Sequence, residues 1–287
     1  MINDVLVKPL SGVTPDSDTP ATIRACPGGS AANQAAWMAH LGAEVTFAGR
    51  VGARDAAYHR RELTRAGVRA HLAPDTQAGT GSIVIMVAPD GARTMFTDRG
   101  ANLRLRRSDV PPGLLDGAAV LHLTGYTFAE PPLLEVALAL LDEARSREIA
   151  VTIDPGSAAF LAQMEPAAFL RWTEGAAVCF PNRDEAAVLT GEPDPVTMAA
   201  RLTRYYGVVV LKLGGEGCVL AVPGEAPVRV AAHPADATDT TGAGDAFCGA
   251  FMSRWLASAP AADLTGAAEF AVRIAATVVT RFGARPV

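Results

Sequence analysis

The sequence lacks a long apolar run and an excess of positive charge. Its longest apolar stretches, such as residues 118–123 and 208–211, have the length of buried strands and fall far short of the roughly 20 residues that cross a bilayer. With 25 Lys and Arg against 30 Asp and Glu, the formal net charge is -5, so the chain has no surplus of cations for nucleic-acid phosphates. We therefore expect neither a membrane nor a nucleic-acid partner.

Cysteine is also scarce, and no metal-like or redox-like spacing occurs. The four cysteines are scattered along the chain: Cys26, Cys179, Cys218 and Cys248. None of the five histidines is clustered with a cysteine, so there is no zinc site to argue for. The amino terminus lacks the basic, apolar and small-residue succession of a signal peptide. These features predict a cytoplasmic protein with reduced cysteines.

The residues that are abundant predict a folded α/β protein. With 49% hydrophobic and 19% charged residues, the chain can bury enough apolar surface to exclude disorder. From residue 118 onward, short apolar strands alternate with helices, a pattern that requires crossover connections and a largely parallel sheet covered on both faces. The expected strands are 118–123, 149–153, 176–180, 207–213 and 217–222, and the expected helices are 132–147, 182–189, 196–205, 244–256 and 262–280.

Two stretches, residues 5–25 and 79–98, depart from this alternation. The second reads as two strands, Ser82–Val87 and Arg93–Thr97, joined by a turn that contains Asp90-Gly91. An Asp-Gly pair between strand-like residues is a hairpin signal. Such a hairpin would add an antiparallel flap to a parallel core, either as a lid over a site or as a surface hairpin without function.

The strongest local signal is residues 239–247, Asp-Thr-Thr-Gly-Ala-Gly-Asp-Ala-Phe, which precede an Ala-rich helix. Two glycines around one alanine let backbone N–H groups turn inward, and a helix start adds unpaired N–H groups and positive charge. This geometry is an anion cradle. Asp245 is then placed to accept a proton from a hydroxyl that attacks a phosphorus atom held there. The alternative is a capped helix in which Asp245 only complements the helix dipole.

A second glycine-rich helix start lies at residues 27–36, Pro-Gly-Gly-Ser-Ala-Ala-Asn-Gln-Ala-Ala. The paired glycines allow a ligand to approach the backbone closely. Asn33 stands inside an otherwise apolar helix, so its side chain needs either a backbone carbonyl or a ligand hydroxyl as a partner. The alternative interpretation is an ordinary helix cap at Ser30.

Two further polar segments follow expected strands, where open α/β sheets bind ligands. In residues 181–185, Pro-Asn-Arg-Asp-Glu, Glu185 either caps a helix or, with Asn182, holds a hydrated Mg²⁺ through water. Residues 212–217, Lys-Leu-Gly-Gly-Glu-Gly, form either a hairpin turn or one edge of a nucleotide site.

The order of these four motifs resembles the ribokinase-like (PfkB) family of carbohydrate kinases. The resemblance extends over essentially the whole chain, including the hairpin and the closing residues 279–284. It implies one kinase domain over residues 1–287, with a doubly wound sheet and a small β lid from about residues 5–25 and 79–98. Because the lid often pairs between subunits in this family, it also implies a homodimer.

The resemblance further implies roles for individual residues. Asp245 looks like the catalytic base, with an anion hole for phosphate formed by Gly242, Ala243 and Gly244. Four residues match substrate-binding positions: Asp4, Gly28, Gly29 and Asn33. Four match nucleotide-binding positions: Asn182, Lys212, Gly214 and Gly217. Three match cation positions: Glu185 for Mg²⁺ through water, and Asp239 and Thr241 for a monovalent cation, usually K⁺.

The chain also departs from the family pattern. Family members usually begin with a strand before the substrate-binding aspartate, whereas here Asp4 follows only three residues; we expect either a late start or a compensating segment. Ser30 stands where ribokinases proper carry lysine, and Thr124-Gly125 near where they carry a substrate-binding glutamate. Because Ser30 is neutral, we expect a neutral sugar or nucleoside as substrate, unless Arg93 or Arg99 reaches in from the lid to bind a sugar acid.

The resulting hypothesis is an ATP-dependent carbohydrate kinase. A sugar hydroxyl lies against Asp245 in line with the γ-phosphate of ATP, and Mg²⁺ bridges the phosphates. One alternative is a nucleoside kinase of the same fold, and another is a sugar- or nucleotide-binding regulator without catalysis. A Rossmann-type oxidoreductase also suits the α/β rhythm, but no GxGxxG follows an early strand with an acidic residue about 20 positions later.

Overall fold

Four short apolar segments form the parallel centre of the largest sheet, as the alternating pattern predicts. They are β7 (Val120–Thr124), β8 (Ala150–Asp154), β9 (Val178–Cys179) and β10 (Val208–Lys212), paired in that order in the computed structural model. Two antiparallel strands, β11 (Cys218–Ala221) and β12 (Val228–Val230), extend the sheet beyond β10. The structure describes residues 1–287 except 89–92, 237–238, 259–262, 282 and 287.

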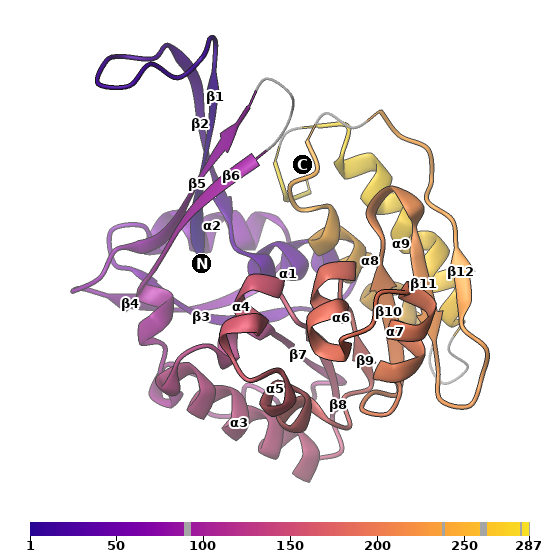
Figure 1. Ribbon diagram of the computed structural model, residues 1–287. Helices are drawn as coiled ribbons and strands as arrows, with labels where there is room; N and C mark the ends of the chain where they lie inside the picture. Colours follow the sequence, from indigo (N-terminus) through magenta and orange to yellow (C-terminus); the bar gives the residue numbers. More distant parts are fainter. Residues whose placement is uncertain (89–92, 237–238, 259–262, 282, 287) are drawn as a thin grey trace.

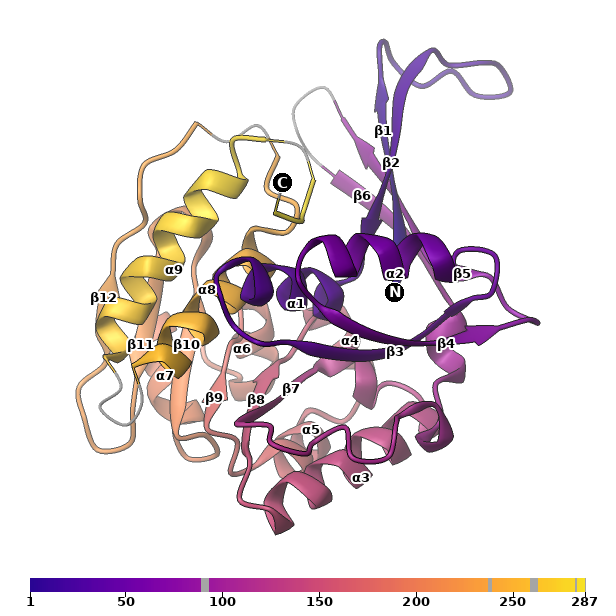
Figure 2. The same ribbon diagram turned by 180° about the vertical axis from the view of Figure 1, so that it is seen from behind.

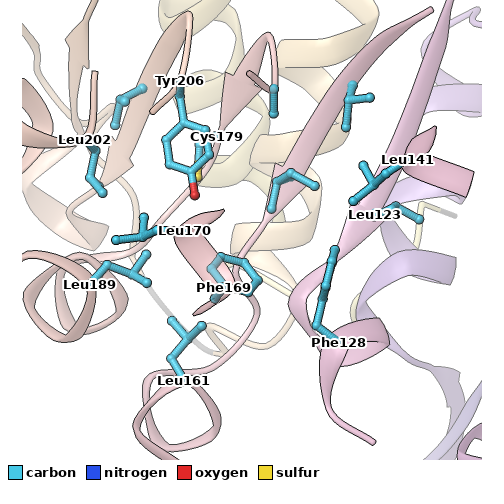
Figure 3. Close-up of a cluster of buried hydrophobic side chains, with 14 of the residues drawn as sticks. Leu123, Phe128, Leu141, Leu161, Phe169, Leu170, Cys179, Leu189, Leu202 and Tyr206 are labelled. Atoms are coloured by element: carbon cyan, nitrogen blue, oxygen red, sulfur yellow. The ribbon is translucent and has the colours of Figure 1, made fainter. Parts of the chain in front are cut away.

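Helices cover both faces of this sheet (Figure 1). One face carries α3 (Pro131–Ser146), α5 (Pro166–Thr173), α6 (Arg183–Thr190) and α7 (Pro195–Leu202), with the short α4 (Ala158–Gln163) beside α6. Figure 3 shows the apolar core on that side, where Phe128 and Phe169 meet edge to face. The other face carries α8 (Ala243–Ala257) and α9 (Leu264–Val278), and α1 (Ser30–His40) packs against α8. This three-layer arrangement confirms the α/β fold class.

Element boundaries differ from the sequence prediction by a few residues. The helix expected to reach Tyr205 ends at Leu202, because the chain then turns to bury Tyr206, whose hydroxyl lies 2.8 Å from the Thr173 hydroxyl. The predicted start of the last helix at residue 262 lies outside the described residues. No helix in the described part of the chain combines the length and apolar character needed to cross a bilayer.

A four-stranded sheet stands away from this body (Figures 1 and 2). It consists of β1 (Ile2–Pro9), β2 (Ala21–Gly28), β5 (Thr80–Val87) and β6 (Arg93–Gly100), in the order β2-β1-β5-β6. The strands of the predicted hairpin, β5 and β6, pair antiparallel, while its Asp90-Gly91 turn lies outside the described residues. We call this sheet the lid sheet, because its strands come from the two stretches that the sequence analysis singled out.

The chain between the two halves of the lid sheet forms a small parallel pair, β3 (Thr46–Gly52) and β4 (Arg69–Asp75), joined by α2 (Ala56–Arg65). The first residues of the chain form β1 and so belong to the lid sheet, not to the six-stranded sheet. Among the described residues, β7 is an edge strand and β3 pairs only with β4. Short 3-10 turns lie at Ala101–Arg104, Arg107–Asp109, Gly125–Phe128 and Gly214–Glu216.

Candidate active site

The polar residues of the predicted motifs converge where β8 and β10 end. Asp154 closes β8 and Lys212 closes β10, so both lie at the carboxyl edge of the parallel strands, the edge at which such sheets bind ligands. The first turns of α1 and α8 face each other above this edge (Figures 1 and 2), and their side chains are joined by hydrogen bonds. Residues more than 200 positions apart in the chain therefore form one site.

The start of α8 has the geometry that the cradle hypothesis requires. Gly242 is the N-cap residue and has a left-handed backbone, with φ of +79°, and a Cβ atom there would collide with Ala284. Only glycine fits this position. The first N–H groups of the helix have no partners within it, although that of Ala243 donates to the Thr240 carbonyl at 3.3 Å, and the 15-residue helix adds a positive end. This turn can therefore bind an anionic group.

The Asp245 carboxylate is held by three donors from α1. Its Oδ1 accepts hydrogen bonds from Ser30 Oγ at 2.7 Å and Gln34 Nε2 at 3.1 Å, while Oδ2 accepts one from Asn33 Nδ2 at 2.9 Å. Burial raises the pKa of Asp245, and the bonds from Asn33 and Ser30 oppose that rise. Among the described residues Oδ2 has a single donor, which leaves it one lone pair for a further hydroxyl.

The α1 motif differs from the helix-cap interpretation of its sequence, while its role in ligand binding stays a prediction. The helix cap expected at Ser30 is wrong, because Gly29 is the N-cap residue and the Ser30 hydroxyl donates to Asp245. Asn33 was expected to bond a backbone carbonyl or a ligand. Its Nδ2 donates to the Asp245 carboxylate and not to a backbone carbonyl, and its Oδ1 accepts a hydrogen bond from Arg285 Nε at 3.0 Å.

An ion pair that the sequence analysis missed lies beneath Asp245. Lys212 Nζ is 3.0 Å from Asp154 Oδ2, and Gln34 Nε2 donates to the same oxygen at 2.9 Å. Burial lowers the pKa of Lys212, but the Asp154 charge outweighs it and raises the pKa well above its usual value. Gln34 thus bridges the ion pair to Asp245, and its Oε1 is hydrogen-bonded to His122 Nε2.

Asp4, predicted to bind the acceptor, is a buried carboxylate with 6% exposure. It lies against the backbone of Gly28, where a Cβ atom would collide with it. No described residue donates a hydrogen bond to it. Burial and the neighbouring Asp245 raise the pKa of Asp4 to about 6. Since buried polar groups are normally paired, a carboxylate without a donor points to a ligand hydroxyl.

Asn182 and Glu185 cap α6 by binding one another. Asn182 Oδ1 accepts from the Glu185 N–H at 2.9 Å, and the Glu185 carboxylate accepts from the Asn182 N–H at 2.8 Å and from Asn182 Nδ2 at 2.7 Å. Glu185 is only 2% exposed, and burial raises its pKa to about 7. The capping role that the sequence left open is therefore present, and it places Glu185 near the Asp154–Lys212 pair, whose charges act on its pKa.

The remaining predicted residues form two turns. Gly214 and Gly217 lie in the turn that joins antiparallel β10 and β11, where the Leu213 N–H donates to the Gly217 carbonyl at 2.8 Å. The segment with Asp239 and Thr241 leads into α8; Asp239 Oδ1 accepts from the Thr241 N–H at 2.9 Å, and the Asp239 N–H donates to the Val279 carbonyl at 3.0 Å.

The lid sheet reaches the body through Arg99 at the end of β6. The Arg99 guanidinium lies 4.0 Å from the ring centre of Phe160 and 4.8 Å from that of Tyr126. Both rings follow the carboxyl ends of parallel strands, Tyr126 after β7 and Phe160 after β8. A guanidinium over aromatic faces is held by cation–π attraction. The lid sheet is thereby attached beside the site.

Comparison with known proteins shows what the chain as a whole is similar to. Residues 2–287 match the family described as pfkB family carbohydrate kinase. The chain is 30% identical over 286 residues to an ATP-dependent ribose-1-phosphate kinase of Halopiger xanaduensis, covering 94% of this chain and 87% of that protein. It is 29% identical over 265 residues to ribokinase of Bacillus subtilis, covering 90% and 83% of the two chains.

Solved structures of the same architecture include an adenosine kinase from Sinorhizobium meliloti, with a TM-score of 0.87 at 23% identity, covering 100% of this chain and 94% of that one. Since the superposed region covers the whole chain, the two proteins share the fold, including the part of the chain that forms the lid sheet. Because the family match spans nearly the entire chain, and a relative of almost equal extent shares 30% of its residues, this chain belongs to the PfkB family of carbohydrate kinases.

Proposed function

We propose that this protein transfers the γ-phosphoryl group of ATP to a hydroxyl of a small sugar or nucleoside, with Asp245 as the general base. The observation that carries the proposal is the state of the Asp245 carboxylate. Three hydrogen bonds fix it at the positive end of α8, and Oδ2 retains a lone pair. A base must lie within hydrogen-bond reach of the proton that it removes, and this oxygen is the one to which an acceptor hydroxyl can bind.

The phosphate side of the reaction is assigned to the start of α8. The N–H groups of Ala243 and Gly244 with the helix end supply fixed positive charge for the transferring oxygens, which is where charge spreads in phosphoryl transfer. Lys212 adds a further positive charge close to this turn, because a Cβ atom on Gly244 would lie 3.9 Å from its Nζ. The nucleotide lies along the turn of Gly214 and Gly217, next to Asn182.

The metal sites are part of the same proposal. The described residues contain no cluster of three or more His, Cys, Asp or Glu side chains suited to a metal ion, which fits Mg²⁺ held through water and phosphates and not by a protein cage. Each Glu185 oxygen that accepts from Asn182 keeps a second lone pair for such a water. Bound there, Mg²⁺ would neutralise phosphate charge. A monovalent cation such as K⁺ would lie beside Asp239 and Thr241, at the segment that leads into α8.

The acceptor is assigned to the space bounded by Asp4, Gly28, Gly29 and Asn33. We infer a neutral sugar or nucleoside, because Asp4 and Asp245 bring two carboxylates to this pocket, which disfavour an anionic acceptor. Arg99, a lid residue that was considered as a partner for a sugar acid, instead stacks on Tyr126 and Phe160. The Arg93 side chain lies outside the described atoms.

A homodimer through the lid sheet completes the proposal. Strand register places Val5, Val84 and Phe96 in one row, on the face opposite Asp4, because successive side chains in a strand alternate. Phe96 is 58% exposed, Val84 37%, and Ile23 on the neighbouring strand 64%. An exposed apolar sheet face of this kind fits a second copy of the chain.

The test is ADP release from ATP in the presence of ribose, fructose, adenosine or ribose 1-phosphate, each supplied separately with Mg²⁺. We expect at least one neutral acceptor to be phosphorylated and Asp245→Asn to lose the activity. Binding of ATP without turnover of any acceptor would instead favour the regulator, a protein that binds sugar or nucleotide without catalysis.

A further inference from the structure

The end of the chain returns to the site after α9. Ala284 packs against Gly242, and its carbonyl accepts a hydrogen bond from Trp37 Nε1 at 2.8 Å. The next residue, Arg285, lies between the glycines that precede α1 and the Asn33 side chain. Its Nη2 donates to the Gly28 carbonyl at 3.1 Å, and its Nε donates to Asn33 Oδ1 at 3.0 Å.

The contact with Arg285 determines which way the Asn33 amide points. A guanidinium has only donors, so it requires the oxygen of the amide and excludes its nitrogen. With Oδ1 facing Arg285, Nδ2 faces Asp245 and donates to Oδ2 at 2.9 Å. If the amide were reversed, Oδ1 would face the carboxylate and repel it. The three side chains thus form a row of hydrogen bonds. Arg285 donates to the oxygen of the Asn33 amide, and the nitrogen of the same amide donates to Asp245.

Stability does not account for Arg285. No carboxylate of the described residues lies within ion-pair distance of its guanidinium, and Nη1 is buried without a hydrogen-bond partner. Burial lowers the pKa of Arg285, although the charge of Asp4 and the groups of Tyr58 and Glu62 on α2 oppose this. A half-buried cation without an ion partner costs free energy, so a function at this position is the better explanation.

We propose that Arg285 is a positioning residue, which holds the Asn33 amide in the orientation that donates to Asp245. The inference rests on the proposed function, because it assumes that Asp245 is the base. When Arg285 is removed, the amide is free to rotate and the donor to Oδ2 is lost for part of the time. The carboxylate is then less well oriented toward the acceptor hydroxyl and is less strongly held in its ionised form.

Other groups also act on Asp245, and the experiment must leave them in place. Ser30 and Gln34 donate from α1, Asp154 repels from β8, and Asp4 repels from β1. Cys248 on α8 and Tyr126 after β7 face it as well. None of these residues makes a hydrogen bond to Arg285, so a substitution at Arg285 changes only the Asn33 branch directly.

The first experiment compares Arg285→Met and Arg285→Lys with Arg145→Met, using whichever acceptor of the panel above wild type phosphorylates. Arg145 is a matched control because its guanidinium also makes two hydrogen bonds to protein oxygens, in its case the backbone carbonyls of Trp172 and Glu174, far from the site. We expect Arg285→Met to lower kcat about ten- to a hundredfold, the effect of losing a hydrogen bond to a charged group. The acidic limb of its pH profile should move to higher pH, and Arg285→Lys should restore most of the rate.

A double-mutant cycle distinguishes positioning from direct acceptor binding. If Arg285 acts through Asn33, the variant Asn33→Ala/Arg285→Met should be no slower than Asn33→Ala alone. The inference would be overturned if the two substitutions lowered kcat independently, or if Arg285→Met raised the acceptor KM and left kcat and the pH profile unchanged. Either result would leave the kinase proposal intact. A wild type that phosphorylates no acceptor would overturn the kinase proposal instead.

A second measurement requires no activity and applies even if turnover is absent or Arg285→Met folds poorly. The chain has only four asparagines, Asn3, Asn33, Asn102 and Asn182, so the side-chain amide NMR signals can be assigned by single substitutions. The Asn33 amide protons should exchange slowly with water in wild type and in Arg285→Lys, and at least tenfold faster in Arg285→Met or Arg285→Gln. Equal exchange in all four proteins would show that Arg285 does not hold the amide.

Discussion

The ammonium group of Lys212 at the end of β10 lies 3.0 Å from the carboxylate of Asp154 at the end of β8, two parallel strands that β9 separates. Their side chains are 13% and 5% exposed. A pair this buried keeps both charges only because the partners and their hydrogen bonds replace water. Through Gln34, the same pair also supports the Asp245 carboxylate, so the stability of the fold and the geometry of the site depend on one network.

Breaking that pair should be strongly destabilising. Lys212→Met leaves the Asp154 charge buried without its cation, which costs about 3–5 kcal/mol of the free energy of unfolding. Urea denaturation measures the loss, with Lys8→Met on the exposed part of β1 as a control that should change stability by less than about 0.5 kcal/mol. The double variant Asp154→Asn/Lys212→Met should recover part of the loss. A loss below about 1 kcal/mol in Lys212→Met would contradict a buried, mutually dependent pair.

If Asp245 is the base, its substitution should lower the rate of phosphoryl transfer and leave ATP binding nearly unchanged. Asp245→Asn keeps the size of the side chain but removes the proton acceptor, so phosphoryl transfer should fall about 10²–10⁴-fold. ATP affinity, measured by calorimetry, should change little because the N–H groups of Ala243 and Gly244 remain. Turnover within a factor of a few of wild type would mean that Asp245 serves only as a charge at the helix end.

Much of this arrangement is readable from local sequence patterns. The alternation of strands and helices predicts the parallel sheet, and Gly242 and Asp245 are found by their spacing before an Ala-rich helix. Local patterns also predict the antiparallel strands β5 and β6, because the register of a hairpin is set by residues close together in the chain. In these places, the residues that decide the structure are neighbours in sequence.

The residues that the sequence analysis missed are those whose role depends on distant partners. Gln34 reads as one more residue of an Ala-rich helix, yet its amide joins Asp154 to Asp245, across 120 and 211 positions. Asp154 ends a strand and is followed by Pro-Gly, which reads as a turn. Arg285 lies 252 positions from the asparagine that it holds. No periodicity or spacing encodes such pairs.

The proposed dimer through the lid sheet gives a prediction about association. Phe96→Lys introduces a charge into the apolar row of the lid sheet, which should shift the protein from dimer to monomer in sedimentation velocity experiments. Val228→Lys is the matched control, since Val228 is 46% exposed on a strand of the six-stranded sheet and should leave association unchanged. A wild type that is monomeric at high micromolar concentration would contradict the dimer, as would a dimer that survives in Phe96→Lys.

Asp4 leads to a prediction in which one substitution raises stability at high pH and weakens acceptor binding. The pKa of Asp4 in the folded protein is about 6, above its usual 3.8, because burial and Asp245 disfavour the charge. A raised pKa means that the protonated form favours folding: the stabilising contribution is complete below about pH 3.8 and is lost as the pH rises through 6. Asparagine cannot ionise, so Asp4→Asn should be more stable than wild type at pH 8, by up to about 3 kcal/mol.

The gain in Asp4→Asn should shrink to near zero at pH 4, as measured by urea unfolding at both pH values, while Asp18→Asn in the exposed loop between β1 and β2 should differ little from wild type at either. At the same time, Asp4→Asn should raise the acceptor KM by about tenfold or more, because the amide no longer accepts two hydroxyl protons as a carboxylate does. If Asp4→Asn were only as stable as wild type at pH 8, burial would not disfavour the charged form of Asp4. An unchanged acceptor KM would show that Asp4 does not bind the acceptor.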